Sequence, residues 1–194
     1  MSLVELMIGL TVVAILVMVA VPSFSTALQN RQIRNAANAI QAGLQAAKTE
    51  ALRRNRNINF VMGTGSAWQV VCTTPDTNTT DGEVNCPESA LQTFSAQDGV
   101  ANAAIAMSER VGSASGSTAS SPSFTGTLRF TPLGRVDAST LGAANVAVFS
   151  ITNPTGGTCA AAGGEMRCLN IVVASTGQIR VCDPAVSSGD PRAC

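Results

Sequence analysis

Two patterns of apolar positions divide the first 54 residues of the chain. Residues 6–21 carry no charge and are apolar on every side, and Glu5 stands directly before them. Residues 29–54 instead show a period of three or four, which predicts an amphipathic helix with one buried side. The apolar positions on that side are Ile33, Ala36, Ala37, Ile40, Leu44, Ala47 and Ala51. Pro22 separates the two patterns and predicts a kink, so the two parts would form one bent rod ~80 Å long.

After residue 55 the chain consists of short apolar or alternating runs separated by turn residues, a pattern typical of strands. VANAAIAM (100–107) fits a helix or a strand, because alanine favours the former and the setting favours the latter. The Ser-rich stretch 113–123 has low complexity and predicts a mobile loop. The fold class is therefore α+β, with a long kinked N-terminal helix packed on an antiparallel β-sheet head domain. The predicted strand regions are INFVM (58–62), AWQVVC (67–72), TLRF (127–130), NVAVFSI (145–151) and CLNIVVASTGQIRVC (168–182), the last as two strands joined by a Ser-Thr-Gly turn.

The apolar segment is just long enough to cross a bilayer as a helix. A secretory signal peptide fits less well, because no positive region precedes the segment and no small-residue cleavage site follows it. A carboxylate beside such a segment is costly unless a cation neutralises it. Since Lys and Arg are absent before Arg31, the only cation near Glu5 is an N-terminal amine. Within one chain, that amine belongs to Met1.

Composition argues against an enzyme. The formal charge is balanced as well, because Lys plus Arg and Asp plus Glu both number 12. This disfavours a generic nucleic-acid binder, which is usually basic. The chain has no His and no Tyr, which removes the commonest general base, the commonest zinc nitrogen ligand and any Ser-His-Asp triad. The Gly-containing stretches at 63–66 and 163–165 indicate turns. We therefore expect no catalytic residues, no metal site and no cofactor.

The six cysteines predict disulfides. They form no CxxC pair, and with an even count and no His, disulfides are favoured over metal ligands. Six cysteines allow 15 connectivities, among which the entropy of loop closure favours sequential neighbours. The expected pairs are Cys72–Cys86, Cys159–Cys168 and Cys182–Cys194. Disulfides in turn place this part of the chain outside the cytoplasm.

The N-terminal stretch MSLVELMIGLTVVAILVMVAVPSF resembles the mature N-terminus of type IV pilins and pseudopilins, which carry a glutamate at the fifth position and a proline at the twenty-second. Glu5 and Pro22 occupy these positions. Further along, TLRFTPLGRV and LNIVVASTGQIRVC are similar to the family that joins the H-type pseudopilins of type II secretion to the T-type and U-type fimbrial minor pilins. The resemblance implies the type IV pilin fold.

The resemblance also implies a function and a set of partners. Residues 1–28 would be the transmembrane and filament-assembly helix, 29–56 the amphipathic half of the same helix, and 57–194 the disulfide-bonded β-rich globular head. A prepilin peptidase would produce the N-terminal amine at Met1, which is then methylated, and Glu5 would pair with the amine of a neighbouring subunit. The chain would be a bacterial inner-membrane protein with its head in the periplasm. It would then enter a pilus as a low-abundance minor pilin that aids assembly or priming, in contact with other major and minor pilins through its N-terminal helix.

Two alternatives remain within this architecture. T-type minor pilins of some naturally competent bacteria bind double-stranded DNA through a Gly-Arg-x-Arg motif, which Gly177, Gln178 and Arg180 match with one arginine replaced by Gln178. Arg192 comes close to this motif if the last disulfide loop folds back. The other alternative is a subunit of a type II secretion pseudopilus, although the cysteine-rich head and the STGQIRVC ending look more like fimbrial minor pilins.

Overall fold

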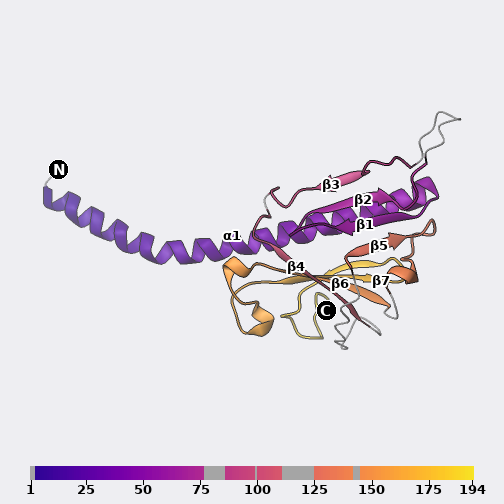
Figure 1. Ribbon diagram of the computed structural model, residues 1–194. Coiled ribbons are helices and arrows are strands. Elements are labelled where there is room, and N and C mark those ends of the chain that lie inside the picture. Colours follow the sequence, from indigo (N-terminus) through magenta and orange to yellow (C-terminus); the bar gives the residue numbers. More distant parts are fainter. Residues whose placement is uncertain (1–2, 77–85, 99, 111–124, 142–144) are drawn as a thin grey trace.

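The computed structural model describes residues 3–76, 86–98, 100–110, 125–141 and 145–194, with only the backbone described at 19–23 and 110. Its first element is one continuous helix, α1 (Leu3–Arg54), whose 52 residues correspond to a rod ~78 Å long. Figure 1 shows that the N-terminal half of α1 projects beyond the head and curves, whereas the C-terminal half packs against the strands. Pro22 lies within the projecting half, and the side chain there is outside the described set.

The strands that the structure describes form two four-stranded sheets. The predicted α+β class with antiparallel strands is confirmed, whereas the division into two sheets was not predicted from the sequence. All described strand pairs are antiparallel. The first sheet has the order β3-β2-β1-β5, with β1 at Ile58–Met62, β2 at Trp68–Cys72, β3 at Gln92–Phe94 and β5 at Thr127–Phe130. The second has the order β4-β6-β7-β8, with β4 at Ala104–Arg110, β6 at Val146–Thr152, β7 at Leu169–Ala174 and β8 at Ile179–Cys182. The 3-10 helices are η1 (Ala138–Thr140), η2 (Pro154–Gly156) and η3 (Ala160–Ala162).

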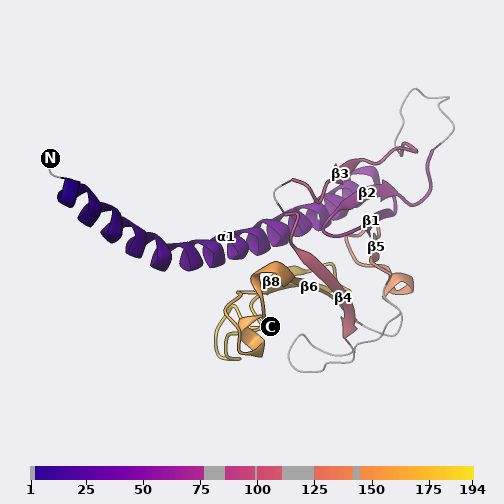
Figure 2. The same ribbon diagram turned by 60° about the vertical axis from the view of Figure 1, so that its left-hand side comes forward.

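The C-terminal half of α1 contacts strands of both sheets and provides the centre of the core (Figures 1 and 2). Every residue of its predicted apolar side is at most 1% exposed, which confirms the periodicity. Gly43 lies on this side, where a Cβ atom would come within 2.8 Å of the rings of Phe60 and Trp68. The missing side chain therefore lets the helix lie directly on the aromatic cluster of the first sheet. Trp68 is 8% exposed and stacks on Phe94, as expected for a packing residue.

Most of the predicted strands are found within a residue or two of their expected bounds. The sequence left open whether 100–107 is helix or strand, and the structure forms β4, because its residues pair with β6 along the whole strand. Sequence reasoning missed β3, which has only three residues and no apolar alternation. The predicted loop at 113–123 lies outside the described residues.

The cysteines form the disulfides Cys72–Cys86, Cys159–Cys168 and Cys182–Cys194. These are the sequential pairings expected from loop closure, with partners 14, 9 and 12 residues apart. Each disulfide closes a loop of the head, and the last one ties the C-terminal segment to the end of β8.

Candidate functional site

In the projecting half of α1, residues 6–18 are apolar around the whole helix apart from the single hydroxyl of Thr11. The large apolar side chains of residues 3–18 are between 51% and 80% exposed. A helix that is apolar on all sides is normally buried in protein or in a membrane, whereas a surface helix has a polar side. Among the described residues, no helical segment combines the length and hydropathy of a membrane span.

Glu5 lies in the first turn of α1, where a negative charge stabilises the helix dipole. The carboxylate is exposed and forms no ion pair with any residue that the structure describes. Met1, which the sequence suggested as one source of the partner amine, lies outside the described residues. The pairing of Glu5 with an N-terminal amine therefore stays a prediction.

A group of polar contacts fastens α1 to the base of the head. Asn153 is fully buried, and its side-chain amide donates to Oε1 of Gln29 at 2.6 Å and to Oε1 of Gln32 at 3.2 Å. One residue further along the helix than Gln29, Asn30 accepts a hydrogen bond from the backbone N–H of Arg167 at 2.7 Å. These contacts begin directly after residue 28, and the exposed apolar part of the helix lies before them.

A second junction joins the two sheets at the opposite end of the head. The turn 131–135 after β5 meets the turn 175–178 between β7 and β8, and the N–H of Val136 donates to the carbonyl of Ser175 at 3.0 Å. The amine of Lys48 on α1 donates to the carbonyl of Gly177 at 2.9 Å. Gly177 has a φ of +81°, and a Cβ atom there would lie 1.9 Å from the carbonyl oxygen of Gly134. Gly177, which the sequence singled out as part of a DNA-binding motif, thus has a packing role that requires glycine.

The other candidate DNA-binding residues are not gathered into one site. Gln178 is exposed, and Arg180 lies half-buried on β8 opposite Val172, without an ion pair among the described residues. Arg192 belongs to the loop closed by Cys182–Cys194 and forms an ion pair with Asp190 at 2.7 Å. The hydrogen bond from Arg192 lowers the pKa of Asp190 to about 2. The guanidinium of Arg192 is therefore already paired.

Sequence reasoning missed Arg135, which belongs to the turn that meets Gly177. Its Cα would lie 3.4 Å from a Cβ atom on Gly177, and its side chain is exposed without an ion pair in the described part of the chain. The turn signal in TLRFTPLGRV was visible in the sequence. The approach of this turn to the motif, 42 residues further along, was not.

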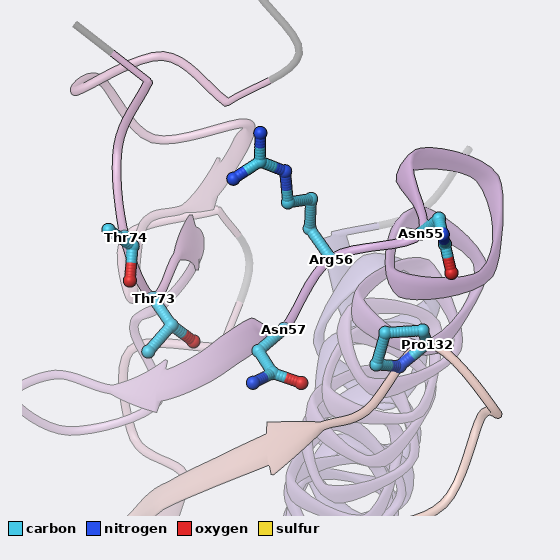
Figure 3. Close-up of a pocket in the computed structure, with 6 residues that line it drawn as sticks. All are labelled: Asn55, Arg56, Asn57, Thr73, Thr74 and Pro132. Carbon is cyan, nitrogen blue, oxygen red and sulfur yellow. The ribbon is translucent and has the colours of Figure 1, made fainter.

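A polar hollow of about 240 Å³ lies at the C-terminal end of α1 (Figure 3). Arg56 extends to one side of it and Asn57 to the other, and the guanidinium of Arg56 is paired with Asp76 at 3.0 Å. Over the residues that the structure describes, no group of His, Cys, Asp or Glu could hold a metal ion. The hollow is lined by a paired arginine, amides and hydroxyls. None of these groups forms a nucleophile in contact with a general base. Its lining residues are Asn55, Arg56, Asn57, Thr73, Thr74 and Pro132.

Comparison with known proteins places these features in context. The sequence model of the type II transport protein GspH matches residues 36–177. The structure is similar to the type IV minor pilin FimU of Pseudomonas aeruginosa PAO1 in its P21 crystal form, with a TM-score of 0.51 and 16% identity over 84% of this chain and 96% of that one. The P65 form of the same pilin gives a TM-score of 0.49 and 17% identity over 83% of this chain and 98% of that one. No curated protein sequence matches the chain.

Proposed function

The chain belongs to the family of the type II transport protein GspH, whose model covers most of it, and on this premise we propose that it is a minor pilin of a type IV pilus. In this role it is a low-abundance structural subunit that takes part in assembling or priming the filament. The observation that carries the proposal is the projecting half of α1, which is apolar on every side and extends away from the head (Figure 2). Packing among the equivalent helices of other pilins would bury it.

This segment has to stay out of water at both stages, in lipid before assembly and among pilin helices afterwards. Fully burying one Leu, Ile, Val or Met side chain contributes about 1.5–3 kcal/mol, and those of residues 3–18 are all more than half exposed. Burying even half of that surface contributes several kcal/mol. Since lipid and pilin helices both provide such burial, contacts between subunits favour the filament over the membrane.

Before assembly, the same segment anchors the subunit in the inner membrane as a single pass, with the head in the periplasm. The three disulfides of the head support this side, since such bonds persist in oxidising compartments. A prepilin peptidase produces the N-terminal amine at Met1, which is then methylated. Extraction from the membrane exchanges lipid contacts for pilin contacts.

Glu5 pairs with the N-terminal amine of a neighbouring subunit during docking. The basis is a lone carboxylate that would be costly to bury without a cation, on a helix whose next charged residue is Arg31. Glu5→Ala should reduce incorporation into sheared filaments at least tenfold in quantitative immunoblots, with the membrane-bound pool unchanged. Glu165→Ala is the matched control, because Glu165 is an exposed carboxylate in the head without an ion pair among the described residues. Normal incorporation of Glu5→Ala would contradict the proposal.

A pseudopilus of type II secretion is the alternative filament. The cysteine-rich head with its three disulfides resembles the heads of fimbrial minor pilins more than those of H-type pseudopilins, which favours the pilus. Deletion of the gene decides between the two: loss of surface pili with normal protein secretion supports the pilus, and the reverse result supports the pseudopilus.

DNA capture is the second candidate function, and the approach of Arg135 to the Gly177 turn favours it. Arg135 and Arg180 are both without ion pairs among the described residues, so Arg135 supplies from a second segment the one guanidinium that the motif lacks at Gln178. Full-length oxidised protein in detergent, titrated with duplex DNA at several salt concentrations, tests this. Salt-sensitive binding that Arg180→Ala or Arg135→Ala weakens, with Arg192→Ala unchanged, supports DNA capture. Absence of binding at low salt leaves the head with subunit contacts alone.

A further inference from the structure

Charge is distributed unevenly along α1, although the whole chain is neutral. No Asp or Glu occurs between Glu5 and Glu50, whereas Arg31, Arg34 and Lys48 fall within this stretch. The amine of Lys48 is used by the carbonyl of Gly177. Arg31 and Arg34 are exposed, and neither forms an ion pair or a side-chain hydrogen bond within the described part of the chain. The base of the head therefore presents two free guanidiniums.

These arginines continue the apolar side of the projecting helix. Phe24, Leu28 and Arg31 follow one another at intervals of four and three residues and share one side of α1. Phe24 is 65% exposed and Leu28 is 42% exposed, so this side is open to its surroundings up to the arginine. The opposite side carries Gln29 and the buried Ile33, which contact the head. Apolar surface thus changes to cationic surface within about one turn, on the side that the head leaves uncovered.

The height of this change matches the edge of a bilayer. Residues 3–22 of α1 span ~30 Å, which is the thickness of the hydrocarbon core. Arg31 lies nine residues beyond, ~13 Å above the core, but side chains of a helix tilt toward its N-terminus and an arginine stem reaches several ångströms toward the membrane. Its guanidinium then lies ~7 Å above the hydrocarbon, where the headgroup layer of ~5–7 Å places the phosphates. Arg34 is one turn higher, and the usual tilt of ~20° lowers it by only ~1 Å. Its guanidinium then lies ~11 Å above the hydrocarbon, within a Debye length of the phosphates.

We propose that Arg31 and Arg34 bind the phosphates of anionic phospholipids in the outer leaflet of the inner membrane while the subunit awaits assembly. The inference rests on the membrane stage of the proposed function. Guanidinium groups suit this partner because they bind phosphate oxygens bidentately and stay charged at all relevant pH values. Glu165 is the exposed carboxylate of the neighbouring 159–168 loop and forms no ion pair with either arginine. Bound lipid would hold the head at a set height and add a contact that extraction into the filament must break.

The test uses the full chain reconstituted in vesicles of equal parts phosphatidylglycerol and phosphatidylcholine. After mild detergent extraction, the ratio of the two lipids retained on the protein is measured by mass spectrometry. Wild-type protein should retain phosphatidylglycerol preferentially. In Arg31→Gln/Arg34→Gln the ratio of retained phosphatidylglycerol to phosphatidylcholine should fall about fivefold for each arginine removed, at low salt. The preference of the wild-type protein should decrease as the salt concentration rises.

The matched control is Arg53→Gln/Arg56→Gln, which removes two exposed arginines from the opposite end of the head and should retain the wild-type preference. Equal lipid ratios for wild type and Arg31→Gln/Arg34→Gln, in protein that resists carbonate extraction, would overturn the inference and leave the membrane anchor intact. Wild-type protein that carbonate removes from the vesicles would overturn the anchor itself. If inorganic phosphate abolishes the preference, the arginines bind free phosphate. If Arg31→Gln/Arg34→Gln keeps the wild-type lipid ratio but fails to enter filaments, the arginines bind an acidic subunit. Either result would overturn the lipid assignment.

Discussion

Replacing Gly177 by alanine should uncouple the two sheets of the head. The residue adopts a left-handed conformation with φ of +81°, which costs an alanine ~1–2 kcal/mol. The new Cβ atom would also lie 1.9 Å from the carbonyl oxygen of Gly134. Non-bonded heavy atoms in contact are normally separated by ~3.5 Å. Because the clashing carbonyl belongs to the backbone of a turn, the clash is relieved only if the two turns move apart by more than ~1 Å.

The separation breaks two hydrogen bonds that cross the junction. The bond from the N–H of Val136 to Ser175 is 3.0 Å long, and a neutral bond of this kind contributes ~1 kcal/mol. The bond from the amine of Lys48 to Gly177 is 2.9 Å long and involves a charged donor, so it contributes ~1.5–3 kcal/mol. Together with the conformational cost, Gly177→Ala should destabilise the head by ~4 kcal/mol. In a chain of this size that lowers Tm by ~10 °C.

The assay is thermal unfolding of the full chain in detergent, followed by the fluorescence of Trp68, which is the single tryptophan and is buried. Gly163→Ala is the matched control, because Gly163 has nearly the same φ, +83°, but a Cβ atom there would meet no atom within 4 Å. It should lose only the ~1–2 kcal/mol of the left-handed conformation. Equal losses of Tm for the two variants would refute the role of Gly177 in joining the two sheets.

Three further predictions concern the core, the base and the C-terminal loop. Gly43→Ala should destabilise the head by ~1–3 kcal/mol in chemical unfolding, because the new methyl group meets aromatic rings at 2.8 Å and overpacks the core. Asn153→Ala should cost ~1–2 kcal/mol and speed hydrogen exchange at the base, since it leaves the partly buried side-chain oxygens of Gln29 and Gln32 without their donor; an unchanged exchange rate would contradict this. In Arg192→Gln the pKa of Asp190 should rise from about 2 toward its ordinary range in an NMR titration. Since the pKa is lowered in the folded chain, the stabilising contact is present above pH ~4 and is lost as pH falls toward 2.

The sequence determined those features of this protein that depend on neighbours along the chain. The buried side of α1 follows from a repeat of three and four residues, so the periodicity alone assigns positions such as Ile40 and Leu44 to the core. The cysteine pairs also agree with a local rule, because short loops cost the least entropy to close. The apolar segment and Glu5 pointed to an assembly helix through their resemblance to the N-terminus of type IV pilins. Each of these signals is contained within a few turns of helix or one short loop.

Only the tertiary structure decided how distant segments meet. The strand patterns predicted strands but not their division into two sheets, because alternation identifies a buried face and does not identify the neighbouring strand. The contact of Asn153 with Gln29 spans 124 residues, and Gly177 meets a turn 43 residues earlier in the sequence. Arg135 gained its place beside the candidate motif in the same way. Such contacts depend on the packing of both sheets against one helix, and no local pattern records which surfaces of the sheets face each other when the core closes.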